Sequence, residues 1–509
     1  MPITIEGTPV AVPTYNSPLV VVGNGYVYIA YPGSPTLNLC SNQATAPLDP
    51  TVLTSMCFLN NTIFIVDGTT IQTLPLEANF SLPTVIPYLP GLWVASTSYS
   101  VGQYVTYVVS GVTNIYQNIV ATSGSTAPNA DATHWAPLGA PPTDCFMCCN
   151  WRGRFVLAGD KNNPQNFYMA RVGQPYDWNY AALDPAAAVA GNLSESGQIG
   201  EPIVALIPYT DDYMLIGCTN SLWMLQGDPA DGGSIVRVSD SMGLVSPNSW
   251  CVDPAGTLYF IARGGLYSVR PIWEFYQPPQ LLSGETYDQY FQQLINGSYY
   301  ISMEWDVDYK YMHIFATPTV EIGGSPTAGI HLIFDQRNGG LWPQQYSAYH
   351  GPTATTKYTA NNNTAGQRAI LLGGWDGYIR QWTNSALNDT SVPIASYATL
   401  GPLKASPEAS IFSAITIDFG EVGPGDTETQ WNVLAQLNAG PDAYSVTEGI
   451  PHSTYVVANS LDRRSKTYRQ RFRSGWISLQ LSNTTLDTYW SFESALLEFS
   501  DGGRNRERR

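Results

Sequence analysis

The sequence predicts an all-β protein: a β-propeller-like body of six or seven blades, an inserted small β module and a C-terminal β-sandwich-like region. Three features of the composition support this prediction. The 509 residues include 45 Gly and 37 Pro, which punctuate many short strands. Aromatic residues reach 12%, with 32 Tyr and 14 Trp, and such side chains suit pleated, half-buried surfaces. Charged residues make up only 12%, against about 25% in ordinary soluble domains.

The blades are predicted from a repeated phrase in which a polar or glycine turn precedes an apolar-aromatic strand of about five residues. Its instances are Gly23–Ala30, Asn60–Gly68, Trp151–Gly159, Thr210–Gly217, Pro254–Ala262, Asp308–Phe315 and Arg368–Trp382. A four-stranded blade needs about 40–50 residues, so most intervals between these turns hold one blade. The long interval after Asn60 holds a blade and an insertion.

The same pattern divides the chain into five parts. We predict first propeller blades at 1–89, an inserted module at 90–140, the remaining blades at 141–393, a C-terminal β domain at 394–500 and a disordered basic tail at 501–509. Only Glu285–Asn296 has apolar residues at helical spacing. Four long strands are expected in the C-terminal domain, at Ile411–Phe419, Thr429–Leu437, Tyr468–Leu481 and Tyr489–Phe499.

Charge is unevenly distributed along the chain. The net charge is −17, yet residues 461–509 hold ten basic and six acidic side chains and carry +4, which leaves −21 on residues 1–460. The acidic body argues against tight, sequence-independent binding to nucleic acid. The basic segment suits docking on an acidic partner or subunit, although a solvated terminus is the plainer interpretation. The candidate docking residues are Arg463, Arg464, Lys466, Arg469, Arg471 and Arg473.

No catalytic, cofactor or metal site is predicted. The five histidines include no His-x-x-x-His pair, and Cys145-x-x-Cys148 has no second pair to complete a zinc site, so a buried strand is favoured there. The acidic pairs Asp211-Asp212 and Asp306/Asp308 are expected to cap turns, although a glycosidase also needs two nearby carboxylates. Seven cysteines, the lack of a signal peptide and the lack of an 18-residue apolar run indicate synthesis in a reducing cytosol and no membrane-spanning segment.

The inserted segment has its own aromatic pattern. The spacing of Trp93, Tyr99, Gly102, Tyr104, Tyr107, Tyr116, Pro128, Trp135 and Leu138 resembles the small chitin-binding type of carbohydrate-binding module. Members of that family stack sugars on exposed aromatic rings. This chain lacks the aromatic that usually follows the position of Tyr116, because residues 117–122 hold none. Two interpretations stay open: a structural spacer, or weak glycan contact through Trp93, Tyr107 or Trp135.

The order of phrases across 145–385 carries a second resemblance. Trp151-Arg-Gly-Arg-Phe-Val-Leu is followed by Gln174-Pro-Tyr-Asp-Trp and by Pro202-Ile-Val-Ala-Leu, and later come Ile333-Phe-Asp-Gln-Arg and Leu371-Leu-Gly-Gly-Trp-Asp-Gly-Tyr-Ile. This succession resembles the tail-hub, or nozzle, propeller proteins of short-tailed bacteriophages, which include the packaged-DNA stabilisation proteins. The inserted module departs from that pattern.

The phage resemblance implies a structural virion protein in the tail, assembled in the host cytoplasm. It implies a homo-oligomeric ring, expected to be six-fold, which contacts the portal adaptor and the tail fibres or spikes, closes the DNA channel and then conducts genomic DNA through its lumen without sequence-specific binding. An acidic wall fits that role, because it repels phosphate. The alternative is a glycan-binding propeller or adhesin that recognises a host surface through the module at 90–140. A glycoside hydrolase is the third candidate.

Overall fold

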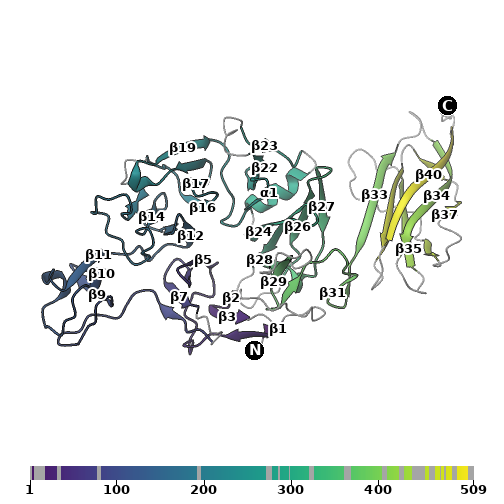
Figure 1. Ribbon diagram of the computed structural model, residues 1–509. Coiled ribbons are helices and arrows are strands. Elements are labelled where there is room, and N and C mark those ends of the chain that lie inside the picture. The colour runs from purple at the N-terminus through teal and green to yellow at the C-terminus, as the bar shows by residue number, and fades with distance from the viewer. Residues whose placement is uncertain are drawn as a thin grey trace. The chain divides into compact units, whose positions relative to one another are not determined.

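The computed structural model describes residues 3–4, 18–30, 36–76, 82–191, 197–270, 278–284, 287–296, 298–319, 326–359, 368–403, 410–422, 429–437, 453–457, 465–469, 472–474, 477–483 and 490–501. It divides into two compact units (Figure 1). Unit 1 comprises Met1–Gln344 and Ala348–Trp382, and unit 2 comprises Gln345–Ser347 and Thr383–Arg509. Both units are built from antiparallel strands, which confirms the predicted all-β, propeller-like fold class.

Within the described residues, unit 1 contains eight antiparallel sheets. Seven of them are numbered blade 1 to blade 7 in chain order, and the eighth is the sheet of the inserted segment. Blade 1 is ordered β1-β4-β3-β2 and consists of β1 (Ile3–Thr4), β2 (Leu19–Gly23), β3 (Tyr26–Ala30) and β4 (Thr36–Leu39). Blade 2 consists of β5 (Ser55–Leu59), β6 (Thr62–Val66), β7 (Ile71–Pro75) and β8 (Ile86–Pro87). Blade 3 consists of β12 (Met147–Trp151), β13 (Arg154–Ala158), β14 (Phe167–Met169) and β15 (Val189–Ala190).

In every other blade the strands pair in chain order, a simple up-and-down arrangement, whereas in blade 1 the strand β1 pairs with β4. Blade 4 consists of β16 (Ile203–Pro208), β17 (Tyr213–Cys218), β18 (Leu222–Gln226) and β19 (Ser234–Ser239). Blade 5 consists of β20 (Trp250–Val252), β21 (Leu258–Ala262), β22 (Gly265–Val269) and β23 (Gln280–Leu281). Blade 6 consists of β24 (Tyr299–Asp306), β25 (Tyr311–Pro318), β26 (Ile330–Asp335) and β27 (Gly340–Gln344), and blade 7 of β28 (Pro352–Thr359), β29 (Arg368–Gly374) and β30 (Ile379–Gln381).

Two-residue turns set the register of several hairpins. Both turn residues have positive φ at Asn24-Gly25, Asn60-Asn61 and Arg152-Gly153, which join β2 to β3 in blade 1, β5 to β6 in blade 2 and β12 to β13 in blade 3. Such turns match the right-handed twist of the flanking strands. The turn-strand phrase of the sequence therefore corresponds to a β-hairpin in each of these blades.

Apolar side chains fill the spaces between successive blades. The contact of blades 3 and 4, for example, contains Val156, Met169, Ile203 and Ile216, each no more than 2% exposed. Similar clusters join blades 4 and 5 and blades 5 and 6. The first blade also packs against the last, through a cluster that includes Leu37 and Ile379. Each blade therefore uses two faces for burial, as alternation along short strands requires.

The helix is short and lies between blades 5 and 6 in the chain. Helix α1 spans Asp288–Asn296, within the range predicted from the sequence, and residues 285–286 lie outside the described part of the chain. Phe291 and Leu294 are buried in the cluster that joins blades 5 and 6. The helical spacing of apolar residues thus predicted the face of α1 that packs against blades 5 and 6.

The inserted segment is a three-stranded sheet in unit 1, ordered β11-β10-β9. Its strands are β9 (Tyr104–Val109), β10 (Val112–Asn118) and β11 (Trp135–Gly139). The turn Ser110-Gly111 joins β9 and β10, again with two positive φ values. The segment enters the chain between blade 2 and blade 3.

In its described residues, unit 2 contains two four-stranded sheets and the hairpin β31 (Asn388–Asp389) to β32 (Val392–Pro393). One sheet is ordered β33-β39-β35-β36. In the other, β34 pairs with β37, β38 and β40. The strands are β33 (Ser396–Leu403), β34 (Ser410–Val422), β35 (Thr429–Leu437), β36 (Ser453–Val457), β37 (Ser465–Tyr468), β38 (Phe472–Ser474), β39 (Ile477–Asn483) and β40 (Trp490–Asp501).

One expected strand of unit 2 is wrong. The sequence predicts a continuous strand from Tyr468 to Leu481, but β38 and β39 divide that range and belong to different sheets. Gly475 lies between them in the sequence, where a turn-forming residue breaks the apolar alternation. The basic tail after Asp501 lies outside the described residues.

Candidate functional site

The aromatic residues proposed to bind sugar lie in two places on the inserted sheet. Trp135 is 1% exposed and meets Tyr99 edge to face, with ring centroids 5.1 Å apart. Its ring therefore forms the core of the module and does not offer a flat face to a ligand, which corrects the expectation that this residue contacts glycan. Trp93 and Tyr107 are half-buried and pack edge to face at 5.8 Å.

Exposed aliphatic side chains occur over the rest of the module. Leu92, Val101 and Val94 are 69%, 64% and 57% exposed, and Val108 and Val112 flank the β9–β10 turn at 48% and 51%. Trp135 and Tyr116 turn inward, at 1% and 7% exposed, because this small sheet must bury large side chains to remain folded. The aliphatic residues outside provide no hydrogen-bonding group for a sugar.

A loop of blade 3 holds the module against the body. Tyr176 of this loop stacks on Tyr104 of β9, with ring centroids 5.1 Å apart, and on Tyr88 at 4.9 Å. The Trp178 amide donates to the Leu138 carbonyl at 2.6 Å. Burial raises the pKa of both Tyr88 and Tyr104, so both phenols stay protonated and act as neutral packing groups.

The approach of module and loop requires a glycine at its closest point. Gly139, at the end of β11, has φ +84°, and a Cβ placed there would lie 2.4 Å from the Trp178 carbonyl oxygen. The Trp178 indole donates to the Tyr88 hydroxyl at 2.6 Å, and that hydroxyl donates to the Pro175 carbonyl at 2.6 Å. The module is therefore fixed by stacking, backbone hydrogen bonds and buried polar contacts.

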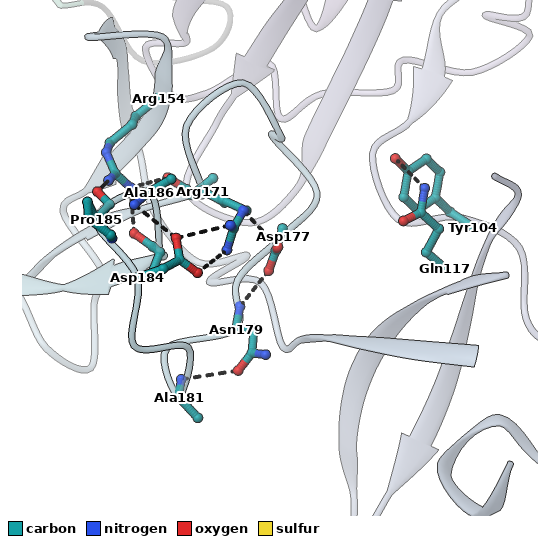
Figure 2. Close-up of polar contacts among 12 residues, drawn as sticks. Tyr104, Gln117, Arg154, Arg171, Asp177, Asn179, Ala181, Asp184, Pro185 and Ala186 are labelled. Carbon is teal, nitrogen blue, oxygen red and sulfur yellow. Dashed lines mark hydrogen bonds and ion pairs between the residues drawn. The ribbon is translucent and has the colours of Figure 1, made fainter. Parts of the chain in front are cut away.

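Charged residues stiffen the same loop (Figure 2). Arg171 donates to both oxygens of Asp184, with Nη–Oδ distances of 2.9 and 3.0 Å, and lies 4.0 Å from Asp177. The Arg171 hydrogen bonds lower the pKa of Asp184, whereas burial raises the pKa of Asp177. Figure 2 also shows the Tyr104–Gln117 hydrogen bond of the module, at 3.3 Å. Leu183, which precedes Asp184 of the Arg171–Asp184 ion pair in the sequence, is fully exposed.

A buried arginine next to this loop connects blade 3 to blade 4. Arg154 of β13 is 0% exposed and donates to Asp228, which lies between β18 and β19 of blade 4. It also donates to the carbonyls of Ala170, Ala187 and Pro185, at 2.9, 2.6 and 3.2 Å. Burial lowers the pKa of Arg154, but the carboxylate and carbonyl partners compensate its charge.

The basic residues proposed for docking are only partly described. Lys466 lies on β37 opposite Ile417 and Arg473 on β38 opposite Ile411. Arg469 is exposed. The other three proposed residues, Arg463, Arg464 and Arg471, lie outside the described residues. Lys466 and Arg473 thus share one neighbouring strand, β34, and docking through them remains a prediction.

The groups considered for chemistry are distributed among the blades. Asp306 accepts from the backbone amides of Asp308 and Tyr309, at 2.9 and 3.2 Å, so it caps a turn. Within the described ranges, no three His, Cys, Asp or Glu side chains come together to hold a metal ion.

A hollow of about 690 Å³ lies between the turns at 150–153 and 208–211. No helix in the described part of the chain is long and apolar enough to cross a membrane.

The sequence analysis did not predict the two ion pairs that stabilise the blade 3 loop and its surroundings, Arg154–Asp228 and Arg171–Asp184. The first pair is separated by 74 residues and has no local signal. The second pair spans 13 residues inside a Pro- and Ala-rich loop. The Gln174-Pro-Tyr-Asp-Trp phrase marks this loop in the sequence, and its aromatic content was the available sign that it packs against something.

No protein-family model matches the chain, and no curated protein sequence matches it. Solved structures with similar folds include the extracellular domain of a hybrid two-component system of B. thetaiotaomicron, at 10% identity and TM-score 0.34 over 80% of this chain and 46% of that one. They also include the dihydro-heme d1 dehydrogenase NirN, at 14% and 0.38 over 74% of this chain and 71% of that one. The apocarotenoid oxygenase of Synechocystis shares 9% at 0.34 over 74% of this chain and 88% of that one. At these values the likeness is limited to a β-rich fold.

Proposed function

We propose that the chain is a structural subunit of a short-tailed phage tail, in which a homo-oligomeric ring closes and then conducts the DNA channel. The observation that supports this proposal is where the phage-like phrases fall on the fold. Trp151–Leu157 forms the first hairpin of blade 3, Pro202–Leu206 enters β16 of blade 4, and Leu371–Ile379 forms the β29–β30 hairpin of blade 7. The phrases thus follow the order of the blades.

The physical character of the body agrees with a role as a scaffold. Apolar clusters join successive blades, the first blade packs on the last, and the buried Arg154–Asp228 pair ties blade 3 to blade 4. Such a body resists deformation because each blade is buried on both sides. The net charge of −17 disfavours retention of DNA through phosphate contacts, as a channel for passing DNA requires.

The proposed partners follow from the same role. Copies of the chain would contact one another around the ring, the portal adaptor would contact one rim, and tail fibres or spikes would attach outside. The inserted module suits a spacer or an attachment point, because the blade 3 loop fixes it rigidly to the body. Low charge density also suits extensive protein contacts.

Mass photometry and electron microscopy of the purified full chain, over a range of protein concentrations, test the proposal. We expect closed rings of defined copy number that become more abundant as concentration rises. A chain that stays monomeric at every concentration, and also stays monomeric beside the virion proteins co-expressed from its own genome, contradicts it.

A glycan-binding adhesin is the second candidate, supported by the half-exposed Trp93–Tyr107 pair. Chitin-oligosaccharide binding measured by titration calorimetry tests it. Binding that is lost in Trp93→Ala but kept in Val101→Ala, an exposed control on the same module, would favour this function. Absence of binding in the wild-type chain leaves the module as a spacer.

A further inference from the structure

Two thiols face each other where blade 2 meets blade 3. Cys57 lies on β5 and Cys148 on β12, the first strands of these blades, and they are 9% and 7% exposed. Both belong to one apolar cluster, and the neighbouring Cys148 thiol contributes to a raised pKa of Cys57. Within the described residues all cysteines are free thiols.

Contacts on either side of the pair fix the alignment of the two strands. The Cys148 amide donates to the Ser55 hydroxyl at 3.1 Å, and that hydroxyl donates to the Cys148 carbonyl at 3.2 Å. Farther along, the Asn150 side chain donates to the Phe58 carbonyl at 2.9 Å. The strands therefore run side by side in the same direction, and Cys57 lies between these two points of attachment.

Alternation along the strands directs both side chains into the shared interface. On β5, Cys57 and Leu59 are buried whereas Met56 and Phe58 are 41% and 53% exposed. On β12, the Cys148 sulfur lies 3.9 Å from the Phe64 carbonyl of blade 2, whereas Cys149 belongs to the cluster between blades 3 and 4. Successive residues of a strand face opposite sides, so Cys148 faces blade 2 and Cys57 faces blade 3.

We propose that Cys57 and Cys148 are an oxidative modification site that forms an inter-blade disulfide. The chain leaves blade 2 after β8, forms the inserted module and returns at β12, so this bond would close the covalent loop at the base of the module. A cross-link between segments far apart in sequence restricts the unfolded chain and stabilises the fold. The bond would hold blades 2 and 3 together at the base of the module.

A hydroperoxide supplies the oxidising equivalents. The smallest hydroperoxide, hydrogen peroxide, is close to water in size. One thiol sulfur attacks a peroxide oxygen, the O–O bond breaks, and the thiol proton leaves with the departing oxygen as water, which gives a sulfenic acid. The second thiol sulfur then attacks the sulfenic sulfur. The S–O bond breaks and the second proton leaves with the hydroxyl as another water. Two thiols and one hydroperoxide thus give one disulfide and two waters when the oxidant is hydrogen peroxide.

The reaction is expected to be slow in the folded protein. Interaction with the Cys148 thiol, together with burial, raises the pKa of Cys57 well above its usual value, so little thiolate is present. Slow formation suits a bond that accumulates after assembly and not during synthesis in a reducing cytosol. A competing partner is Cys145, which is fully buried in the same cluster.

Peptide mapping of the full folded chain tests the proposal. The chain is treated with hydrogen peroxide, checked for a native circular-dichroism spectrum, alkylated after denaturation and digested without reductant. We expect a peptide pair joined through Cys57 and Cys148, two hydrogens lighter than the separate peptides, which dithiothreitol splits. We also expect a reversible rise in Tm.

Variants identify the two sulfurs. Cys57→Ser and Cys148→Ser should each abolish the linked pair, whereas Cys251→Ser, at a buried cysteine of blade 5, should keep it. Folded, peroxide-treated protein in which both thiols stay unlinked, are over-oxidised, or link Cys148 to Cys145 overturns the proposal, as does a linked protein with unchanged or lower Tm. If the serine variants fail to fold, the map of the wild-type chain decides alone.

Discussion

Arg154 and Asp228 form a two-point ion pair across the boundary of blades 3 and 4, with Nε–Oδ2 and Nη2–Oδ1 distances of 2.9 and 3.0 Å. Both side chains are nearly inaccessible, at 0% and 9% exposed. Asp228 also accepts from the Ala230 amide at 3.0 Å, so one carboxylate serves as both a helix cap and an ion-pair partner. The ion pair thus joins strand β13 of blade 3 to blade 4.

Arg154→Met is expected to lower the free energy of unfolding by roughly 3–5 kcal/mol, because removal of one member leaves a buried carboxylate and three carbonyls without their donor. Arg263→Met is the control, since Arg263 is exposed, and its effect should stay within about 0.5 kcal/mol. Urea unfolding followed by tryptophan fluorescence measures both. Equal stability of the two variants would contradict a structural role for the buried pair.

The free energy of unfolding should depend on pH through a buried histidine in blade 6. His331 is 2% exposed, and burial lowers its pKa from 6.5 to about 4. A depressed folded-state pKa means that the neutral ring is favoured by folding. Its contribution is therefore complete above about pH 6.5, is lost as the pH falls towards 4, and amounts to roughly 3 kcal/mol.

Thermal unfolding between pH 8 and pH 4 measures this effect, with His331→Gln as the comparison. The variant cannot titrate at this position, so the stability difference between wild type and variant should stay constant above pH 7 and shift against the wild type below 6.5. Parallel curves across the whole range would show that His331 is not the responsible group.

The blades were predictable because their signal is local. Asn24-Gly25 and Arg152-Gly153 supply the positive φ values that hairpins need, and the apolar runs beside them are long enough for one strand each. Ion pairs such as Arg154–Asp228 were not predictable, because nothing within the Trp151–Leu157 phrase specifies a partner 74 residues away. Burial of an arginine is also rare enough that exposure is the default expectation.

The module shows a different limit. Its aromatic spacing predicted a small β unit, but spacing alone does not say which rings face the core. Trp135 pairs with Asn118 in the β10–β11 ladder, and its buried ring packs against Tyr99 and in one cluster with Val105 and Tyr116. Sugar-binding and core-forming aromatics carry the same sequence signature, and only three-dimensional burial separates them.

The docking of the module should depend on Gly139. A methyl group at this position would lie 2.4 Å from the Trp178 carbonyl oxygen, in addition to the strain of φ +84°. Gly139→Ala is therefore expected to loosen the contact with the blade 3 loop. Hydrogen exchange at the Trp178 amide and at residues 104–118 should rise in this variant.

Gly111→Ala provides the matched control for that substitution. Gly111 has a similar φ of +85° but nothing within 4 Å of a built Cβ, so the variant carries the backbone strain, about 1 kcal/mol, without the clash. Faster exchange at Trp178 in both variants would assign the effect to strain and not to the close approach. Exchange that rises only in Gly139→Ala identifies the clash.

Trp135→Ala should unfold the inserted sheet while the blades stay intact. The side chain is 1% exposed, and removal of a buried tryptophan costs about 3–5 kcal/mol, which is more than a small three-stranded unit can lose. Trp93→Ala, at a half-buried ring, should cost less and leave exchange slow at Asn118, which is 0% exposed. Hydrogen exchange resolved over residues 99–139 measures both variants against the protected strands β13 and β17. If Trp135→Ala keeps full protection of the module, the ring is not the centre of its core, and a surface role for Trp135 returns to consideration.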